Sequence, residues 1–317
     1  MADKTLKKIS FVIPCYGSEN TIENVTAEIF RALENSKYAC EVILVNDASP
    51  DKVWEKITGL TKKYKNITGL KLAKNFGQYC ALMAGYARAT GDAVVSIDDD
   101  GQCSPLEVFK LIDKLNEGYD VVFAAYKHKR HNLLRNIGSV LNNFMAEILI
   151  GKPRGMQVMI SYYIARKFVI DEILKYKGPY VYPVGLLLRT TGRLADVRVE
   201  HQERKSGRSG YSFRKLFELW LNGFTAFSIK PLRLASLLGF ALSVVGFLYT
   251  AWILVEKFLD PNMVAGYSSI MAAVIFIGGV TMAMLGIIGE YIGRIYISIN
   301  NAPQYVVSEI ISGEADG

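Results

Sequence analysis

Short apolar runs alternate with stretches of helical character through the first 125 residues of the chain. The runs are rich in Val and Ile, which is typical of parallel strands that are covered on both faces. The predicted strands are Ile9–Ile13, Glu41–Val45, Ile67–Leu72, Ala93–Ile97 and Asp120–Ala125. The predicted helices are 19–35, 52–64, 77–89 and 105–116. This alternation predicts an open, mostly parallel α/β sheet with helices on both faces.

The pattern continues less regularly towards residue 210. Residues 127–155 are basic and are expected to be helical, and strand-like pieces return at Met159–Ala165 and Leu194–Glu200 around another helix. Residues 201–210, with the sequence HQERKSGRSG, are expected to form a basic loop. We therefore assign residues 1–210 to one α/β domain.

Two long uncharged runs lie near the end of the chain. The 22 residues of Leu234–Val255 and the 29 residues of Pro261–Gly289 contain no charged side chain. Each run can cross a hydrocarbon core about 30 Å thick, which requires roughly 20 helical residues. We predict transmembrane helices at 231–259 and 264–290 and a cytoplasmic tail at 291–317. Buried core helices are the alternative, which two such runs so close together disfavour.

The segment 211–230, just before these runs, has an amphipathic pattern. The large apolar residues on one side of this helix are Phe213, Leu216, Phe217, Trp220 and Leu221. We expect the helix to lie on the bilayer surface, although an ordinary packed helix has the same pattern.

The charge is distributed unevenly along the chain. The net charge is +7, but only three basic and six acidic residues follow residue 230, so the first 230 residues hold a net +10. Lys230, Arg233 and Arg294 flank the outer ends of the two uncharged runs, and only Lys257 lies between the runs. The positive-inside rule therefore places the N-terminal domain in the cytoplasm, and no secretory signal is expected at the N-terminus. A basic surplus is compatible with nucleic acid, an anionic membrane or phosphate-bearing substrates, and a bilayer tether favours the last two. The four cysteines have no zinc spacing and are expected to be reduced.

Polar residues follow the first two predicted strands, in the sequences PCYGSE and NDASPD. Either sequence alone is explained equally well as a turn. Tyr16 nevertheless offers an aromatic face for stacking, and Asp47 offers a carboxylate that can accept an N–H group of a base. Ligands of open α/β sheets bind at the carboxyl ends of the strands, where both residues are expected to lie.

Three consecutive carboxylates follow the predicted strand Ala93–Ile97. Neighbouring carboxylates repel by roughly 1 to 4 kcal/mol per close pair, which a solvated turn tolerates and a cleft offsets with a cation. Mg²⁺ typically takes one or two carboxylates together with substrate phosphates. Asp98 and Asp100 can reach one side of such an ion, and the amide oxygen of Gln102 can complete its shell.

Together these motifs resemble those of the family 2 glycosyltransferases, which have the GT-A (Rossmann-like) fold. The chain is most similar to members that attach a sugar to a polyprenyl phosphate, such as dolichol-phosphate mannose synthases, bactoprenol glucosyltransferases and undecaprenyl-phosphate aminoarabinose transferases. PCYGSE stands where the family has P-x-Y-N-E, NDASPD where it has D-D-x-S-x-D, LAKNFGQ where it has L-x-R-N-F-G and DDDGQ where it has D-x-D-x-Q. HQERKSGRSGYSFRKL, KPLRL and GEYIGRIY extend the resemblance over nearly the whole chain.

The resemblance implies a role for each motif. The residues expected to bind the nucleotide sugar are Pro14, Tyr16, Glu19, Asp47, Lys74, Asp98 and Asp99. The expected ligands of Mg²⁺ or Mn²⁺ are Asp98, Asp100 and Gln102. The residues expected to contact the phosphates and the acceptor are Arg135, Arg204 and Ser209. The expected catalytic residues are Asp98, Asp100 and Arg204.

The sequence departs from the family pattern at several positions. Gly17 and Ser18 replace the usual Asn-Glu, so Glu19 takes the acidic role one residue later. Asn46 replaces the first of two aspartates, and Lys74 replaces an arginine. The segment MISYYIAR lacks the carboxylate of the family's G-D-F-R-L segment, so we assign no protein base.

The resemblance implies an inverting, metal-dependent transfer of a sugar from a nucleotide sugar, with UDP favoured, to undecaprenyl phosphate. The reaction is expected at the cytoplasmic face of the inner membrane, in a multi-pass protein that modifies cell-envelope glycans such as lipopolysaccharide or teichoic acid. We expect the protein to form a homo-oligomer, a flippase to act downstream of it, and no nucleic acid to bind. The alternatives are an inactive membrane-bound nucleotide-sugar scaffold and a processive polysaccharide synthase, although no tryptophan follows an arginine as in the Q-x-x-R-W segment of those synthases.

Overall fold

A computed structural model describes residues 6–126, 153, 156, 161–178, 181–200, 237, 239–241, 244–246, 248, 252, 255, 266–300 and 303–313. The chain divides into two compact units. One unit is formed by Met1–Tyr211 together with Ala302–Gly317, and the other by Ser212–Asn301. The first unit contains a sheet that has eight strands within these described residues, and the second contains the long helix α10 (Tyr267–Ile299).

The strands of the sheet are β1 (Lys8–Cys15), β2 (Ala39–Asn46), β3 (Ile67–Leu72), β4 (Ala93–Ser96), β5 (Val121–Tyr126), β6 (Tyr163–Arg166), β7 (Leu194–Val199) and β8 (Val307–Ser312). Their order in the sheet is β7-β5-β6-β4-β1-β2-β3-β8. The pairs β1–β2, β1–β4, β2–β3 and β5–β7 are parallel, and β4–β6, β5–β6 and β3–β8 are antiparallel. The mostly parallel α/β sheet predicted from the sequence is confirmed.

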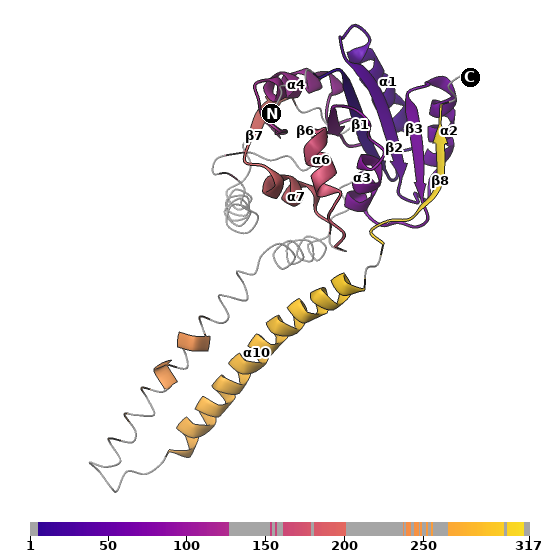
Figure 1. Ribbon diagram of the computed structural model, residues 1–317. Helices are drawn as coiled ribbons and strands as arrows, with labels where there is room; N and C mark the ends of the chain where they lie inside the picture. The colour runs from indigo at the N-terminus through magenta and orange to yellow at the C-terminus, as the bar shows by residue number, and fades with distance from the viewer. Residues whose placement is uncertain are drawn as a thin grey trace. The chain divides into compact units, whose positions relative to one another are not determined.

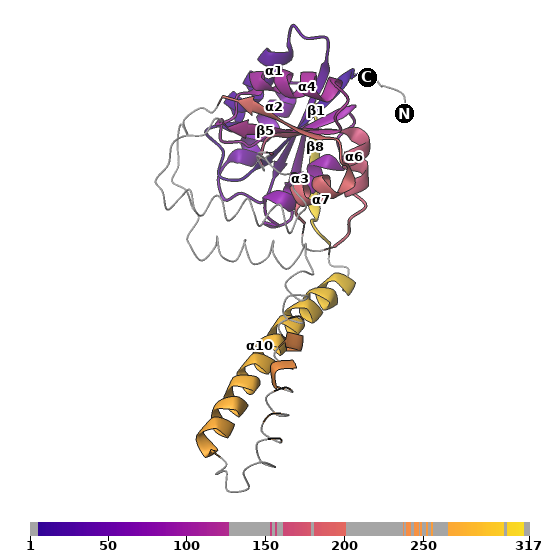
Figure 2. The ribbon, with the colours of Figure 1, turned by 90° about the vertical axis from the view of Figure 1, so that its left-hand side faces the viewer.

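Helices cover both faces of this sheet, as Figure 2 shows. The helices on one face are α1 (Ile22–Leu33), α2 (Val53–Lys63) and α4 (Val108–Asn116), the last preceded by a short 3₁₀ turn at Pro105–Glu107. The helices on the other face are α3 (Gln78–Tyr86), α6 (Lys167–Ile173) and α7 (Pro183–Thr190). The sheet is therefore the middle layer of three.

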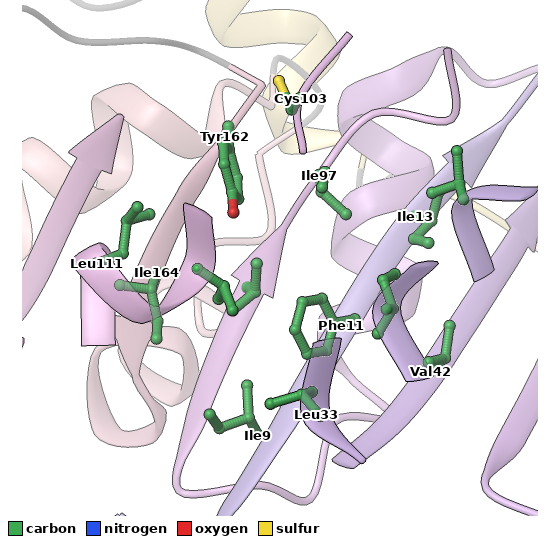
Figure 3. Packing of buried hydrophobic residues seen from close by; sticks show 14 of the residues in the cluster. Ile9, Phe11, Ile13, Leu33, Val42, Ile97, Cys103, Leu111, Tyr162 and Ile164 are labelled. Atoms are coloured by element: carbon green, nitrogen blue, oxygen red, sulfur yellow. The ribbon is translucent and has the colours of Figure 1, made fainter. Parts of the chain in front are cut away.

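The central strand β1 shows how the sheet is buried between these layers. Ile9, Phe11 and Ile13 belong to the core on the α1 side, together with Leu33 (Figure 3), whereas Val12 belongs to the core on the α3 side. Burial of apolar surface stabilises the fold by about 25 cal/mol per Å². Because β1 is buried along nearly its whole length, the loop that follows it starts from a fixed position.

The last strand, β8, comes from the end of the chain and lies beside β3 (Figure 1). The Gly313 N–H group donates a 3.0 Å hydrogen bond to the Ile67 carbonyl oxygen, and Ile311 packs against the core. The strand falls within 291–317, where we predicted a cytoplasmic tail, and its place in the sheet was not predicted. The chain therefore returns from α10 to the α/β sheet.

Helix α10 overlaps the predicted membrane span at 264–290 and continues to Ile299. The segment Phe276–Ile299 is long and apolar enough to cross a membrane, and its most apolar stretch is not buried within the protein. The predicted interfacial helix at 211–230, and most of the first predicted span at 231–259, lie outside the described residues.

Candidate active site

The carboxyl ends of β1, β2 and β4 lie side by side because β1 pairs in parallel with both of its neighbours. An open cleft of about 340 Å³ lies at these strand ends. Its lining residues are Pro14, Cys15, Tyr16, Asp47, Asn75, Gly77, Gln78, Asp98, Asp99 and Asp100. The structure thus brings together residues that the sequence places in four separate loops.

The loop after β1 presents an aromatic ring at the cleft. Tyr16 is 55% exposed, and its backbone N–H donates to Oδ2 of Asp99 over 3.1 Å. Gly17 has a φ of +72°, which L side chains rarely adopt, and its N–H donates to Oγ of Ser49 over 2.8 Å. These bonds hold the turn while the Tyr16 ring stays available to stack on a nucleobase.

Asp47, which follows β2, is only 3% exposed. Its Oδ1 accepts the backbone N–H of Phe76 over 2.7 Å, and its Oδ2 accepts that of Gly77 over 2.8 Å. Burial raises the pKa of Asp47, and the two N–H donors oppose this shift. Each oxygen keeps further acceptor capacity, so Asp47 can hold the loop after β3 and also meet a base.

Asp98, Asp99 and Asp100 follow β4 and are partly buried. Nε2 of Gln78 donates to Oδ1 of Asp98 over 2.7 Å, and the backbone N–H of Gln102 donates to Oδ1 of Asp100 over 3.0 Å. Burial and the charge of Asp100 raise the pKa of Asp98 to about 7. Burial likewise raises the pKa of Asp99 to about 6. Carboxylates in this condition are stabilised in their ionised form by a nearby cation.

The donor set at the end of β4 suits a hard divalent cation such as Mg²⁺ or Mn²⁺, because Asp98 and Asp100 both offer carboxylate oxygens. Among the residues that the structure describes, no group of three or more His, Cys, Asp or Glu side chains could hold a metal ion by itself. Mg²⁺ is usually held by one or two carboxylates and completed by substrate phosphates. The residues therefore fit a metal that binds together with a diphosphate.

Comparison with known proteins identifies the family. Residues 10–174 match the family model described as "Glycosyl transferase family 2", which takes in every loop of the cleft. The chain belongs to glycosyl transferase family 2. Residues 230–295 of this glycosyltransferase also match the model described as "GtrB C-terminal hairpin", which spans both predicted membrane segments. The resemblance seen in the sequence and the predicted fold class are both confirmed.

Two curated relatives match this glycosyltransferase over nearly its whole length. Undecaprenyl-phosphate 4-deoxy-4-formamido-L-arabinose transferase of Salmonella choleraesuis is 32% identical over 315 residues, which are 98% of this chain and 95% of that protein. Uncharacterized glycosyltransferase sll0501 of Synechocystis is 30% identical over 309 residues, which are 96% of this chain and 95% of that protein.

Among solved structures, mannosyl-3-phosphoglycerate synthase from Rubrobacter xylanophilus has a TM-score of 0.51 at 17% sequence identity. The likeness covers 68% of this glycosyltransferase and 71% of that chain. At this identity the likeness concerns the fold alone, and it agrees with the GT-A architecture predicted from the sequence.

Glu19 and Lys74 were also predicted as site residues, but their side chains contact other parts of the protein. Oε2 of Glu19 accepts the backbone N–H of Lys52 over 3.0 Å at the start of α2, and Nζ of Lys74 lies 5.0 Å from the ring centroid of Phe76. Neither Glu19 nor Lys74 is among the described residues that line the cleft. The predicted residues that lie outside the described part of the chain are Arg135, Arg204 and Ser209.

Gln78 lines the cleft but was not among the predicted site residues. It directly follows the Asn-Phe-Gly sequence of the LAKNFGQ motif, whose place after β3 was the available signal. The direction of its side-chain amide depends on how the ends of β3 and β4 are placed, which the sequence pattern does not reveal. The other lining residues that we did not predict are Cys15, Asn75 and Gly77.

Proposed function

We propose that this glycosyltransferase transfers a sugar from a nucleotide sugar, with UDP as the favoured nucleotide, to undecaprenyl phosphate. The reaction inverts the anomeric configuration, uses Mg²⁺ or Mn²⁺ and modifies glycans of the cell envelope. The observation that carries the proposal is the cleft, where the exposed Tyr16 ring, the buried Asp47 carboxylate and three consecutive aspartates meet at neighbouring strand ends.

The acceptor is supported by similarity along the whole chain. The Salmonella relative, 32% identical over 98% of the chain, carries undecaprenyl phosphate in its name. The match to a C-terminal hairpin and the exposed apolar face of α10 support an enzyme that works at a bilayer. A long polyprenyl chain stays in the bilayer, so a tethered catalytic domain meets its phosphate without a three-dimensional search.

The donor is supported by the chemistry of the cleft. The Tyr16 ring offers a stacking face to the base, and Asp47 offers an acceptor to a base N–H group. Asp98 and Asp100 would hold the metal, with the predicted help of Gln102. The bound metal would neutralise charge on the departing diphosphate. Arg204 and Arg135 are proposed to contact the phosphates.

The acceptor supplies its own nucleophile in this proposal. The second pKa of a phosphate monoester is about 6, so its dianion is abundant at neutral pH. An oxygen of this dianion forms a bond to the anomeric carbon, while the bond from that carbon to the diphosphate oxygen breaks and its electrons leave with the nucleoside diphosphate. No proton has to be removed, so no protein base is needed. Attack opposite the leaving group inverts the anomeric centre.

The proposed location is the inner membrane, which the chain crosses twice, with the catalytic domain in the cytoplasm. The basic residues at the outer ends of the two uncharged runs, Lys230, Arg233 and Arg294, support this orientation under the positive-inside rule, since only Lys257 lies between the runs. The product carries a sugar and a charged phosphate, which do not cross a hydrocarbon core unaided. We therefore include a downstream flippase in the proposal. The resemblance to related enzymes supports a homo-oligomer.

The proposal is tested by incubating membranes that contain the full-length protein with undecaprenyl phosphate, Mn²⁺ and a panel of labelled nucleotide sugars. We expect one donor to deliver its label to the organic phase, in a product of inverted anomeric configuration. Donor binding without transfer would identify an inactive scaffold. A water-soluble polymer as product would identify a processive synthase, and retention of configuration would exclude the single displacement.

A further inference from the structure

Gln78 connects two loops of the cleft. It is the first residue of α3, it lines the cleft, and its Nε2 lies 2.7 Å from Oδ1 of Asp98. A hydrogen bond to an ionised carboxylate is shorter and stronger than a bond between neutral groups. The bond therefore restrains the Asp98 side chain at the edge of the sheet where the metal is proposed to bind.

The backbone just before Gln78 is itself held in place. Asp47 accepts the N–H groups of Phe76 and Gly77, the two residues that precede Gln78. Gly77 has a φ of +89°, and a Cβ at this position would meet no atom within 4 Å. Glycine is thus needed there for the backbone conformation and not for space. The start of α3 is fixed from the end of β2, and Gln78 reaches from it to the end of β4.

The surroundings of Asp98 give this hydrogen bond a consequence. Asp98 is followed directly by Asp99 and Asp100, and its side chain lines the cleft. The orientation of its carboxylate therefore decides which of its oxygens can face a cation in the cleft. The Gln78 amide carries no charge, so its bond to Oδ1 restrains this orientation without repelling a cation.

We propose that Gln78 is a positioning residue, which orients the Asp98 carboxylate for the divalent cation and is itself placed by Asp47 through the turn at Phe76 and Gly77. The inference rests on the proposed function, because the metal and the nucleotide sugar meet in this cleft. Asp47 then has two roles, because it holds the turn before Gln78 within the protein and is also predicted to contact the base.

The variant Gln78→Met separates this role from a role in the stability of α3. Met keeps the length of the side chain and a similar helix propensity but lacks the amide donor. A second variant, Gln78→Asn, keeps the amide on a side chain that is one methylene shorter. Asn116→Ala is the matched control, because it removes a side-chain amide that donates to Tyr38 at the end of α4, outside the cleft lining of the described residues.

The experiment measures Mn²⁺ binding to the full-length protein in detergent by titration calorimetry, with UDP present and with GDP in a parallel series. We expect Gln78→Met and Gln78→Asn to raise the Mn²⁺ dissociation constant roughly 10-fold, as loss of a hydrogen bond to a charged group does. The melting temperature and the Asn116→Ala control should match the wild type. In an Asp98→Asn background, Gln78→Met should cause no further loss, because Gln78 acts through Asp98.

Three results would overturn the proposal. They are wild-type Mn²⁺ affinity in Gln78→Met, a full additional loss in the Asp98→Asn background, and a loss of affinity that is matched by a fall in melting temperature in both Gln78 variants. Failure of the proposed function would look different. The wild-type protein would then bind Mn²⁺ and nucleotide but transfer no sugar from any donor, and the calorimetry would still decide the role of Gln78.

Discussion

Two carboxylates of the cleft, Asp47 and Asp98, show how position decides the part that a side chain plays. Asp47 is almost fully buried and accepts a backbone N–H on each oxygen, so it anchors the loop after β3. Asp98 accepts a side-chain amide on Oδ1 and lies next to two more carboxylates, with its pKa raised to about 7 by burial and by the charge of Asp100. The first arrangement satisfies the charge within the protein, and the second favours an added cation.

The exposed ring of Tyr16 leads to a prediction at this scale. Loss of a base–aromatic stack costs about 1–3 kcal/mol, so we expect Tyr16→Ala to raise the KM for the nucleotide sugar roughly 5-fold or more. Tyr16→Phe keeps the ring and should stay within about twofold of the wild type, since stacking needs no hydroxyl. Steady-state kinetics on both variants checks this. Equal KM values in the Ala and Phe variants would contradict the stacking role.

Among the helices, α3 begins at Gln78, which lines the cleft, and its other end packs closely against the sheet. A Cβ on Gly85 would overlap Cγ1 of Val12 and lie 3.1 Å from Cγ2 of Val45. The helix therefore packs against β1 and β2 only with glycine at this position. The closely packed residue Gly85 and the cleft residue Gln78 thus belong to the same helix.

Two glycine substitutions with opposite expected signs test this packing. Gly85→Ala should destabilise the protein by about 1–3 kcal/mol, as overpacking of a close contact does. Gly59→Ala, in the interior of α2, meets no atom within 4 Å and should stabilise the protein by about 0.5–1 kcal/mol through helix propensity. Thermal unfolding of the two variants measures both effects. A stabilising Gly85→Ala would show that α3 is not packed as described.

The sequence predicts best those strands and helices whose own residue types favour the structure without help from distant parts of the chain. The runs that became β1 to β5 are rich in Val and Ile, and their bounds were predicted to within two residues. The segment Met159–Ala165 was predicted as a strand, and within its described residues the strand β6 starts at Tyr163 and continues to Arg166, with a register set by its antiparallel partners β4 and β5. β8 was not predicted although Val307, Ile310 and Ile311 favour a strand, and its place at the edge of the sheet depends on pairing with β3, which is far away in the sequence.

The docking of β8 leads to a second prediction for an element. Ile311 packs against the core, whereas Ile310 on the same strand is 45% exposed. A carboxylate in a buried apolar site is costly, so Ile311→Asp should lower the melting temperature by several degrees, about what a loss of 2–3 kcal/mol causes. Ile310→Asp is the matched control and should melt like the wild type. Equal melting temperatures for the two variants would show that β8 is not docked on the core.

At the scale of the whole molecule, the chain leaves the α/β unit after Tyr211 and re-enters it at Ala302. The segment between these points contains the matched hairpin and α10, and it is therefore inserted into the catalytic unit near its C-terminal end. The motifs that directly follow strands predicted Pro14, Tyr16, Asp47 and the three aspartates of the cleft, but not Cys15, Asn75, Gly77 or Gln78. The insertion was not predictable, because it depends on the pairing of β8 with a strand more than two hundred residues earlier.

This connectivity shapes a test of what the hairpin does. We propose to replace 231–300 by a flexible linker, which removes the hairpin and keeps β8. Donor binding should stay within about twofold of the wild type, because the cleft is built from the α/β unit, while transfer to undecaprenyl phosphate should fall at least about 10-fold as positioning is lost. Calorimetry with UDP and the transfer assay measure the two effects. An equal loss of both would contradict a positioning role for the hairpin.

The proposed function depends on a cation that the aspartates after β4 hold during sugar transfer to a lipid phosphate. Its most direct test compares wild type, Asp100→Asn and the control Asp113→Asn, an exposed position on α4, in the transfer of labelled sugar to undecaprenyl phosphate with Mn²⁺. We predict that Asp100→Asn loses at least about 100-fold in transfer, as loss of a charged metal ligand does, with an unchanged melting temperature. Asp113→Asn should match the wild type. Full activity of Asp100→Asn would contradict the claim.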